Sequence, residues 1–383
     1  MKLWLHEKDT PESTVRHFLP NAAQEQLRHH PTIDLSDDAD KADVGVRIYP
    51  FTQWGPNNQF FGVLQALSLC TELDILCYEP LFSPHHTERN STPIEFGQIY
   101  TLRGDAVFLR RGKDSLKLDG ILTISKRGIL CWPKQVYWKN HRILNFSKPA
   151  SFVGAVHAIN TTNRDRKDVE QLFIQKMQDI IHNATRDKKS VTVAYVYCDA
   201  MERPTPAHVD LAESFARVSQ SLSPASKYTH LASQIMIELG LQTNEYSAIH
   251  LRLKDKCTGT FEECCCQSHA GTRKTFTEKL LEKYILQVQN VTGKNRTFIS
   301  GSPALATFVS EWTWLPKLGV SIWFAKPSHV LEDYEESVVH QLICSKAHTF
   351  YKTVDSTWSD VVQLWQVASR SSTFYLNSVE ISS

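Results

Sequence analysis

The chain has 383 residues, of which 42% are hydrophobic and 22% charged, and its formal net charge at pH 7 is +1. This composition is ordinary for a globular protein with a sizeable core, and the length suits two domains, because a domain usually has roughly 100–200 residues. The near-zero net charge argues against a general nucleic-acid-binding protein, and no apolar run is long enough to span a membrane. The first residues do not have the pattern of a secretory signal peptide.

A strand, a turn and a helix are predicted early in the chain. Asp43–Tyr49 alternates in period two with β-branched residues, as a strand does, and we expect this strand to end at Pro50. The turn Gly55–Gln59 precedes apolar residues at helical spacing, with Asn57 or Asn58 as the N-cap. A second apolar strand follows the helix, and the resulting βαβ unit indicates a parallel sheet.

The turn before this helix is a candidate binding site for an anion. A helix N-terminus presents free N–H groups and the positive end of the helix dipole, and a glycine lets a ligand approach the backbone. Gly55, Pro56, Asn57 and Asn58 are therefore candidate ligand contacts. The alternative is an ordinary capped helix that binds no ligand.

Strands and helices alternate through both halves of the chain. In the first half they are predicted at Asp168–Ile181 (helix), Val191–Tyr197 (strand) and Val209–Leu222 (helix). In the second half they are predicted at Tyr228–Leu239, Thr277–Val291, Pro303–Trp312, Tyr334–Cys344 and Thr357–Val367 (helices), and at Ala248–Arg252, Thr297–Ser300, Val320–Phe324 and His348–Tyr351 (strands). The small, polar segment Ser221–Ser226 is the best candidate for a linker.

This pattern predicts an α/β fold of two Rossmann-like domains, residues 1–225 and 226–383, that face each other across a cleft. In such folds ligands bind just outside the carboxyl ends of the parallel strands. The residues that follow each strand are therefore the first candidates for a site.

The strand Ala248–Arg252 ends in polar side chains. His250 and Arg252 are two residues apart, so in a strand they share one face. An imidazole and a guanidinium at a strand end can hold a polyanion, because the planar fork of arginine matches phosphate oxygens. The alternative is an ordinary surface arginine paired with a nearby carboxylate such as Asp255.

A similar turn, V-D-S-T-W-S-D, joins the last predicted strand to the last predicted helix. Ser356 or Thr357 would cap this helix and leave hydroxyl and N–H groups at its start. Capping alone explains a Ser-Thr pair. Three such turns at strand ends, however, together favour a site for a phosphate-containing ligand.

Sequons and cysteines indicate a protein of the secretory pathway. N-x-S/T sequons, which are used only in the lumen, begin at Asn90, Asn145, Asn160, Asn183, Asn290 and Asn295. The nine cysteines leave at least one outside any internal disulfide, and the run Cys264–Cys266 is interpreted as a loop with one or two pairing partners. A zinc site is disfavoured because no C-x-x-C motif and no nearby pair of histidines supplies tetrahedral spacing. We expect the lumen of the ER or Golgi, with the cytoplasm as the alternative.

Three stretches of the sequence resemble a known family, the GDP-fucose-dependent protein O-fucosyltransferases. G-P-N-N-Q-F-F-G-V-L-Q-A-L is similar to the family's Gly-x-x-Asn-Gln helix start, and I-H-L-R-L-K-D-K-C is similar to its His-x-Arg strand. V-V-H-Q-L-I-C-S-K-A-H-T-F followed by V-D-S-T-W-S is similar to its C-terminal stretch. The resemblance is continuous from about Tyr228 onward and is otherwise concentrated at residues 44–79.

The resemblance implies a GT-B fold and an inverting fucosyltransferase. Such an enzyme transfers fucose from GDP-fucose to a protein Ser/Thr hydroxyl or to a glycan, with no cofactor and no required metal. The first domain would be the acceptor side, with Gly55, Pro56, Asn57 and Asn58 against the donor.

The second domain would be the donor side. The resemblance implies that His250 and Arg252 hold the donor, with Arg252 on the diphosphate, where it stabilises the leaving GDP. Ser356, Thr357 and Trp358 would contact phosphate and the nucleoside region.

Two departures from the family keep alternatives open. Family members often carry an aspartate at the position of His340, which bears on GDP specificity. The loop before Gly55 offers no acid, so Asp255 is the candidate for the general base. One alternative is a catalytically silent relative that binds a glycan or a protein, and another is a transferase that uses a different nucleotide sugar.

Overall fold

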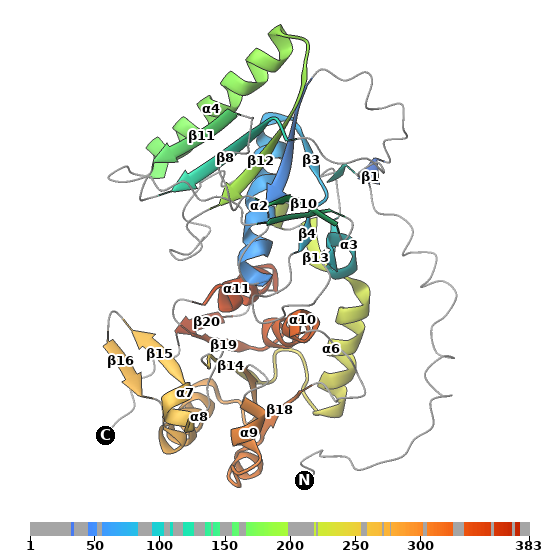
Figure 1. Cartoon of the computed structure of the whole chain (residues 1–383). Helices are drawn as coiled ribbons and strands as arrows, with labels where there is room; N and C mark the ends of the chain where they lie inside the picture. Colours follow the sequence, from blue (N-terminus) through green and yellow to red (C-terminus); the bar gives the residue numbers. More distant parts are fainter. Residues whose placement is uncertain are drawn as a thin grey trace, which may run out of the picture. The chain divides into compact units, whose positions relative to one another are not determined.

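The computed structural model describes elements along most of the chain (Figure 1). It describes residues 32–33, 45–51, 56–82, 94–102, 108–109, 118–125, 135–138, 141–145, 155–160, 166–197, 218–219, 221–253, 259–269, 272–275, 277–301, 305–324, 333–353, 356–369 and 372–375. They form two compact units, an N-terminal unit within residues 30–225 and a C-terminal unit within residues 226–383. The assignment of the acceptor to the first and of the donor to the second stays a prediction.

The N-terminal unit is built on a seven-stranded parallel sheet in the order β1-β7-β3-β2-β12-β8-β11. Its strands are β1 (Thr32–Ile33), β2 (Gly45–Phe51), β3 (Leu76–Tyr78), β7 (Phe108–Leu109), β8 (Gly120–Ser125), β11 (Ala155–Asn160) and β12 (Ser190–Tyr197). Short antiparallel pairs accompany it: β4 (Leu81–Phe82) with β5 (Ile94–Glu95), β6 (Tyr100–Leu102) with β13 (Leu222–Pro224), and β9 (Gln135–Trp138) with β10 (His141–Asn145). The helices are α2 (Pro56–Leu73), α3 (Phe96–Ile99) and α4 (Arg166–Arg186).

The first βαβ unit forms as predicted, with two corrections at its turns. Strand β2 does not end at Pro50 but continues to Phe51. Its pairing with β3 ends at Ile48, so at Pro50 the strand has a neighbour on one side only, where a proline is tolerated. Helix α2 begins at Pro56, so Asn57 and Asn58 lie in its first turn and neither is the N-cap. Proline suits the first helical position, since its fixed φ is helical and the missing N–H would have no partner there.

Helix α2 is fixed by the apolar face that the sequence predicts. Phe60, Val63, Leu64 and Leu67 recur at intervals of three and four residues, and each is at most 2% exposed. The ring of Phe60 also packs on Tyr100, with centroids 4.9 Å apart. Burial of such side chains contributes about 1.5–3 kcal/mol each, which explains why the helix is stable without acidic residues in its first turn.

The C-terminal unit is built on a five-stranded parallel sheet in the order β18-β17-β14-β19-β20. Its strands are β14 (Ser247–Leu251), β17 (Thr297–Gly301), β18 (Val320–Ile322), β19 (Thr349–Lys352) and β20 (Ser372–Tyr375), and a separate hairpin consists of β15 (Cys266–His269) and β16 (Thr272–Thr275). Its helices are α6 (Ser226–Glu238), α7 (Phe261–Cys264), α8 (Glu278–Thr292), α9 (Leu305–Val309), the 3₁₀ helix η4 (Leu315–Leu318), α10 (Asp333–Ser345) and α11 (Thr357–Ser369).

The strand order of this sheet creates a topological switch point between β14 and β19. From β14 the chain proceeds outward to β17 and β18, and then it returns to the other side of β14 to form β19 and β20. Connections on the two sides of β14 therefore leave in opposite directions. In open parallel sheets the ligand binds outside the carboxyl ends of the strands at such a point.

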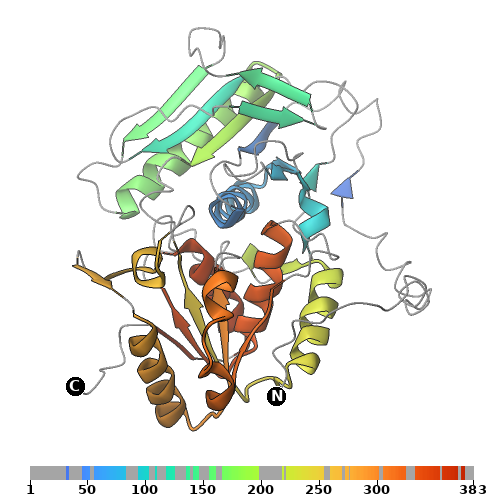
Figure 2. The ribbon, with the colours of Figure 1, turned by 60° about the horizontal axis from the view of Figure 1, so that its bottom comes forward.

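Helices cover both faces of the C-terminal sheet. Figure 2 shows α8 on one face and α6 and α10 on the other. Helix α8 buries Leu281, Tyr284, Ile285 and Val288 at helical spacing, each at most 1% exposed. Its start is capped by Thr277, whose Oγ1 accepts a hydrogen bond of 3.1 Å from the N–H of Leu280. With both faces covered, the strand ends are the places where this sheet can meet a ligand.

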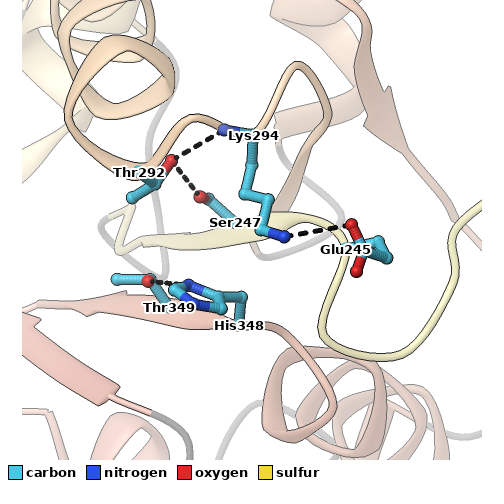
Figure 3. Close-up of polar contacts among 6 residues, drawn as sticks. All are labelled: Glu245, Ser247, Thr292, Lys294, His348 and Thr349. Carbon is cyan, nitrogen blue, oxygen red and sulfur yellow. Dashed lines mark hydrogen bonds and ion pairs between the residues drawn. The ribbon is translucent and has the colours of Figure 1, made fainter.

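At the end of this sheet where the parallel strands begin, neighbouring residues make polar contacts with one another (Figure 3). The hydroxyls of Ser247 and Thr292 are 3.2 Å apart, and Thr292 Oγ1 also accepts a hydrogen bond from the N–H of Lys294. Lys294 Nζ then lies 3.0 Å from Glu245. These contacts join the start of β14 to the end of α8, which indicates a structural role for this edge. A ligand site is therefore expected at the opposite end of the sheet, where the carboxyl ends of the strands lie.

The structure corrects two further predictions. Strand β13 lies within the predicted linker Ser221–Ser226 and includes Leu222, the predicted last residue of the preceding helix. It forms because Leu222 is buried and pairs with Leu102 of β6. The cysteine run is not a loop: Cys264 ends α7 and Cys266 begins β15. Cys264 is disulfide-bonded, as the interpretation of this run expected for at least one of its cysteines.

No helix in the described ranges is long and apolar enough to cross a lipid bilayer.

Candidate functional site

The predicted strand-end residues lie at the switch point of the C-terminal sheet. His250 is the fourth residue of β14, and Arg252 follows the strand directly. A hydrogen bond of 2.7 Å from Thr353 Oγ1 to the carbonyl of His250 links the ends of β14 and β19. The chain then enters α11, so the ends of both strands and the start of a helix come together here.

His250 is held in one orientation by α11. Its Nδ1 lies 2.8 Å from Ser359 Oγ, and its ring stacks on Trp358 with centroids 4.1 Å apart at an angle of 24°. The side chain is buried, with the residue 7% exposed. These contacts leave Nε2 without a hydrogen bond to any residue in the described part of the chain. Nε2 is therefore the atom through which His250 can act on a ligand.

Arg252 provides the fixed positive charge of the site. Its neighbours Leu251 and Leu253 are buried in the core, whereas Arg252 is exposed, as expected from the alternation of side chains along a strand. A guanidinium offers a planar fork of N–H donors that matches phosphate oxygens. The predicted common face of His250 and Arg252 agrees with this arrangement.

Helix α11 begins as predicted and directs its free N–H groups to the same edge. Ser356 occupies the N-cap position, since the helix begins at Thr357 and the carbonyl of Ser356 accepts a hydrogen bond of 3.1 Å from the N–H of Asp360. The thirteen-residue helix supplies the positive end of a dipole. Together with Arg252, this helix start makes the edge suitable for an anion.

Trp358 is held in place by hydrogen bonds to α10. Its Nε1 donates a hydrogen bond of 2.8 Å to Ser337 Oγ, and its carbonyl accepts one of 3.2 Å from Gln341 Nε2. The indole N–H is thus already used, so the predicted contact of Trp358 with the nucleoside region would have to involve the ring itself.

A buried ion pair behind the site was not predicted. Lys352 Nζ lies 3.2 Å from Asp360 Oδ1 and 2.8 Å from Gln363 Oε1, and both charged side chains are 9% exposed. The pair joins the end of β19 to the first turn of α11. A lysine that directly follows two aromatic strand residues, eight residues before an aspartate, is the signal that could have indicated it.

His340 is an uncharged polar group in an aromatic environment. Its Nδ1 lies 3.1 Å from Ser300 Oγ, and its ring packs edge-on against Phe298 and Trp323, with centroids 5.7 Å apart in both cases. It is 2% exposed, and its Nε2 has no hydrogen bond in the described residues, the Glu336 carboxylate being 3.9 Å away. An unsatisfied buried nitrogen is costly unless a ligand or water completes it.

Both buried histidines are neutral at physiological pH. Burial, together with the nearby Arg252 and His340, lowers the pKa of His250 from 6.5 to about 3. Burial also lowers the pKa of His340 from 6.5 to about 4, although the Trp323 backbone opposes the shift. Neither ring therefore brings a positive charge to the site.

These pKa values predict a loss of stability in mild acid. In the unfolded chain a histidine binds a proton below pH ~6.5, so between that pH and about 4 the unfolded state binds more protons than the folded state. The free energy of unfolding should then fall as pH falls from 6.5 to 4, by up to about 1.4 kcal/mol per pH unit for each histidine. Urea unfolding at several pH values measures this slope. His340→Gln should reduce the change of this free energy with pH by the contribution of one histidine. An unaltered slope would contradict the lowered pKa of His340.

The remaining predicted residues are in the N-terminal unit or outside the described residues. Asn57 and Asn58 are partly buried in the first turn of α2, and the buried Asn58 Oδ1 has no hydrogen bond in the described part of the chain. Pro56 begins the same helix. Gly55 and Asp255 lie outside the described residues. A shared site of these residues with Arg252 stays a prediction.

Comparison with known proteins supports the fold. No model of a known protein family and no curated protein matches the sequence. Among solved structures, apo POFUT1 is similar over 87% of this chain and 99% of its own, with 14% identity and a TM-score of 0.54. POFUT1 in complex with GDP-fucose is similar over 88% and 99%, with 15% identity and a TM-score of 0.54. The fucosyltransferase NodZ from Bradyrhizobium is similar over 84% and 92%, with 10% identity and a TM-score of 0.44. The predicted α/β GT-B fold class is confirmed: the chain has a fucosyltransferase-like fold.

Proposed function

We propose that the chain is an inverting fucosyltransferase that transfers fucose from GDP-fucose to a protein Ser/Thr hydroxyl or to a glycan. The observation that carries the proposal is the convergence of Arg252, His250 and the start of α11 at the switch point between β14 and β19. A guanidinium and free helical N–H groups at one strand edge suit a diphosphate. The fold of a protein crystallised with GDP-fucose supports the same donor.

The proposed chemistry needs stabilisation of the leaving group above all. The acceptor oxygen forms a bond to the anomeric carbon of fucose, while the bond from that carbon to the diphosphate breaks and GDP leaves with the electron pair. Arg252 and the N–H groups of α11 would meet the negative charge that develops on the diphosphate. The acceptor proton would go to a base, for which Asp255 stays the candidate. No metal or cofactor is part of the proposal.

A panel of nucleoside diphosphates tests the proposal by thermal shift. A ligand that binds only the folded state stabilises it by RT ln(1 + [L]/Kd), which is about 2.7 kcal/mol at a hundredfold excess over Kd. GDP should therefore raise the melting temperature by several degrees, and UDP, ADP and CDP should raise it less. If none of the four changes the melting temperature, the proposal fails. GDP binding without turnover across an acceptor panel would instead indicate a silent relative that acts as a binding module.

A transferase for a different nucleotide sugar is a second candidate, favoured by His340. This ring is neutral, and its Nε2 has no hydrogen-bond partner among the described residues. It can therefore make one hydrogen bond to a nucleotide, at a position where members of the resembled family often carry a carboxylate. A carboxylate accepts two hydrogen bonds, whereas a neutral histidine nitrogen either donates or accepts one. The same thermal-shift panel decides the matter, because this candidate predicts that a diphosphate other than GDP gives the largest shift.

We also propose that the protein works in the lumen of the secretory pathway. Cys264 is disulfide-bonded, which favours an oxidising compartment, and the sequon residues Asn183, Asn290 and Asn295 are all exposed. When the protein is isolated from a eukaryotic cell that makes it, peptide N-glycosidase should lower its mass, and Asn295→Gln should remove one glycan. Lys294→Met, just outside that sequon, should keep all glycans. A mass unaffected by the glycosidase would contradict lumenal residence.

A further inference from the structure

The hydroxyl of Ser359 has one hydrogen-bond partner in the described residues, the Nδ1 atom of His250. The two atoms are 2.8 Å apart, and Ser359 is 0% exposed. A buried hydroxyl that does not donate its hydrogen bond costs about 1–3 kcal/mol. The direction of this bond is therefore determined by what the serine hydrogen can reach.

A neutral imidazole carries its proton on one of its two nitrogens. If Nδ1 carried it, Nδ1 would donate to Ser359 Oγ, and the serine hydrogen would have no acceptor among the residues that the structure describes. If Nε2 carries it, Ser359 donates to the lone pair of Nδ1, and the Nε2–H of His250, a residue that is 7% exposed, is left for a ligand or water. The second arrangement is favoured by the cost of the unsatisfied hydroxyl.

We propose that Ser359 is a positioning residue that fixes His250 in the Nε2–H tautomer, so that the ring presents an N–H donor to the diphosphate of the bound nucleotide. Only the identity of the ligand, a nucleoside diphosphate, rests on the proposed function. Phosphate oxygens accept hydrogen bonds and carry negative charge, so an N–H favours them, whereas a nitrogen lone pair at the same place would repel them.

The surroundings of the ring keep this donor in place. Trp358 stacks on one face of the imidazole, and it is itself fixed by hydrogen bonds to Ser337 and Gln341 of α10. Thr353 holds the backbone carbonyl of His250. A ring fixed in this way loses little conformational entropy when it donates to a ligand. His250 thus acts as an uncharged donor beside the permanent charge of Arg252.

Nitrogen-15 NMR of the imidazole rings tests the tautomer directly. The spectrum of the wild-type protein, with the His250 signals identified by their loss in His250→Gln, should show Nδ1 unprotonated and Nε2 protonated near pH 7. A proton on Nδ1 would overturn the proposal. This measurement needs no ligand and no variant of Ser359, so it stands whether or not the proposed function holds.

Calorimetry with GDP tests the consequence for binding. Ser359→Ala should raise the Kd for GDP about tenfold, the equivalent of one lost hydrogen bond of about 1.4 kcal/mol. Ser359→Thr, which keeps the hydroxyl, should restore most of the affinity. If the wild type binds GDP and Ser359→Ala binds it equally well, the positioning role is wrong while the proposed function stands. If the wild type binds no nucleoside diphosphate, the proposed function fails and the NMR result alone decides the tautomer.

Discussion

Replacing Arg252 by alanine is expected to lower the rate of fucose transfer from GDP-fucose by about 10²–10³-fold, the usual effect of removing one preorganised donor to a developing negative charge. Arg252 directly follows β14 at the switch point, and its side chain is exposed. The melting temperature should therefore change little. Initial rates at several donor concentrations, with melting curves, separate the two effects. Because the guanidinium acts most strongly on the leaving diphosphate, kcat should fall more than KM rises.

Two variants serve as controls for Arg252→Ala. Arg252→Lys keeps the charge but loses the planar fork, so its rate should lie between those of the wild type and the alanine variant. Lys294→Met alters an ion pair at the opposite edge of the sheet, where Glu245 is 61% exposed, and should leave the rate unchanged. Full activity of Arg252→Ala would remove Arg252 from the site.

Replacing Lys352 by methionine is expected to destabilise the protein by about 3–5 kcal/mol. The change removes the cation that offsets the buried charge of Asp360, with which Lys352 pairs at 3.2 Å. A buried carboxylate that loses its counter-charge bears the full cost of desolvation. Urea unfolding monitored by tryptophan fluorescence measures the effect on the transition of the C-terminal unit.

The double variant Lys352→Met/Asp360→Leu is the matched test of this explanation. Replacing both charges by apolar side chains of similar size is often neutral, so it should recover most of the stability lost in Lys352→Met. Donor affinity should not recover fully, because the polar contacts that tie β19 to α11 would be gone. A loss of less than about 1 kcal/mol in Lys352→Met would mean that the pair behaves as an exposed one.

The periodic features of the sequence predict the fold well. Alternating apolar strands and helices give the parallel sheet of each unit, and the shared face of His250 and Arg252 follows from the period of a strand. The start of α11 at Thr357 follows from the preference of Ser and Thr for helix N-termini. Each of these predictions depends on neighbours within a few residues of one another.

The contacts that orient the site could not be predicted in this way. Ser359 meets His250 across 109 residues of chain, and Ser300 meets His340 across 40. Such pairs depend on the order of strands in the sheet, which local periodicity does not encode. The linker prediction at Ser221–Ser226 was wrong in part for a related reason, since the pairing of β13 with a distant strand outweighs its turn-like composition.

A crystal structure of the protein with GDP tests the central claim most directly. The account predicts the diphosphate at the carboxyl edge of the C-terminal sheet, between β14 and β19, within hydrogen-bond distance of the Arg252 guanidinium and the first N–H groups of α11. A diphosphate bound elsewhere, with Arg252 making no contact to it, would contradict the account.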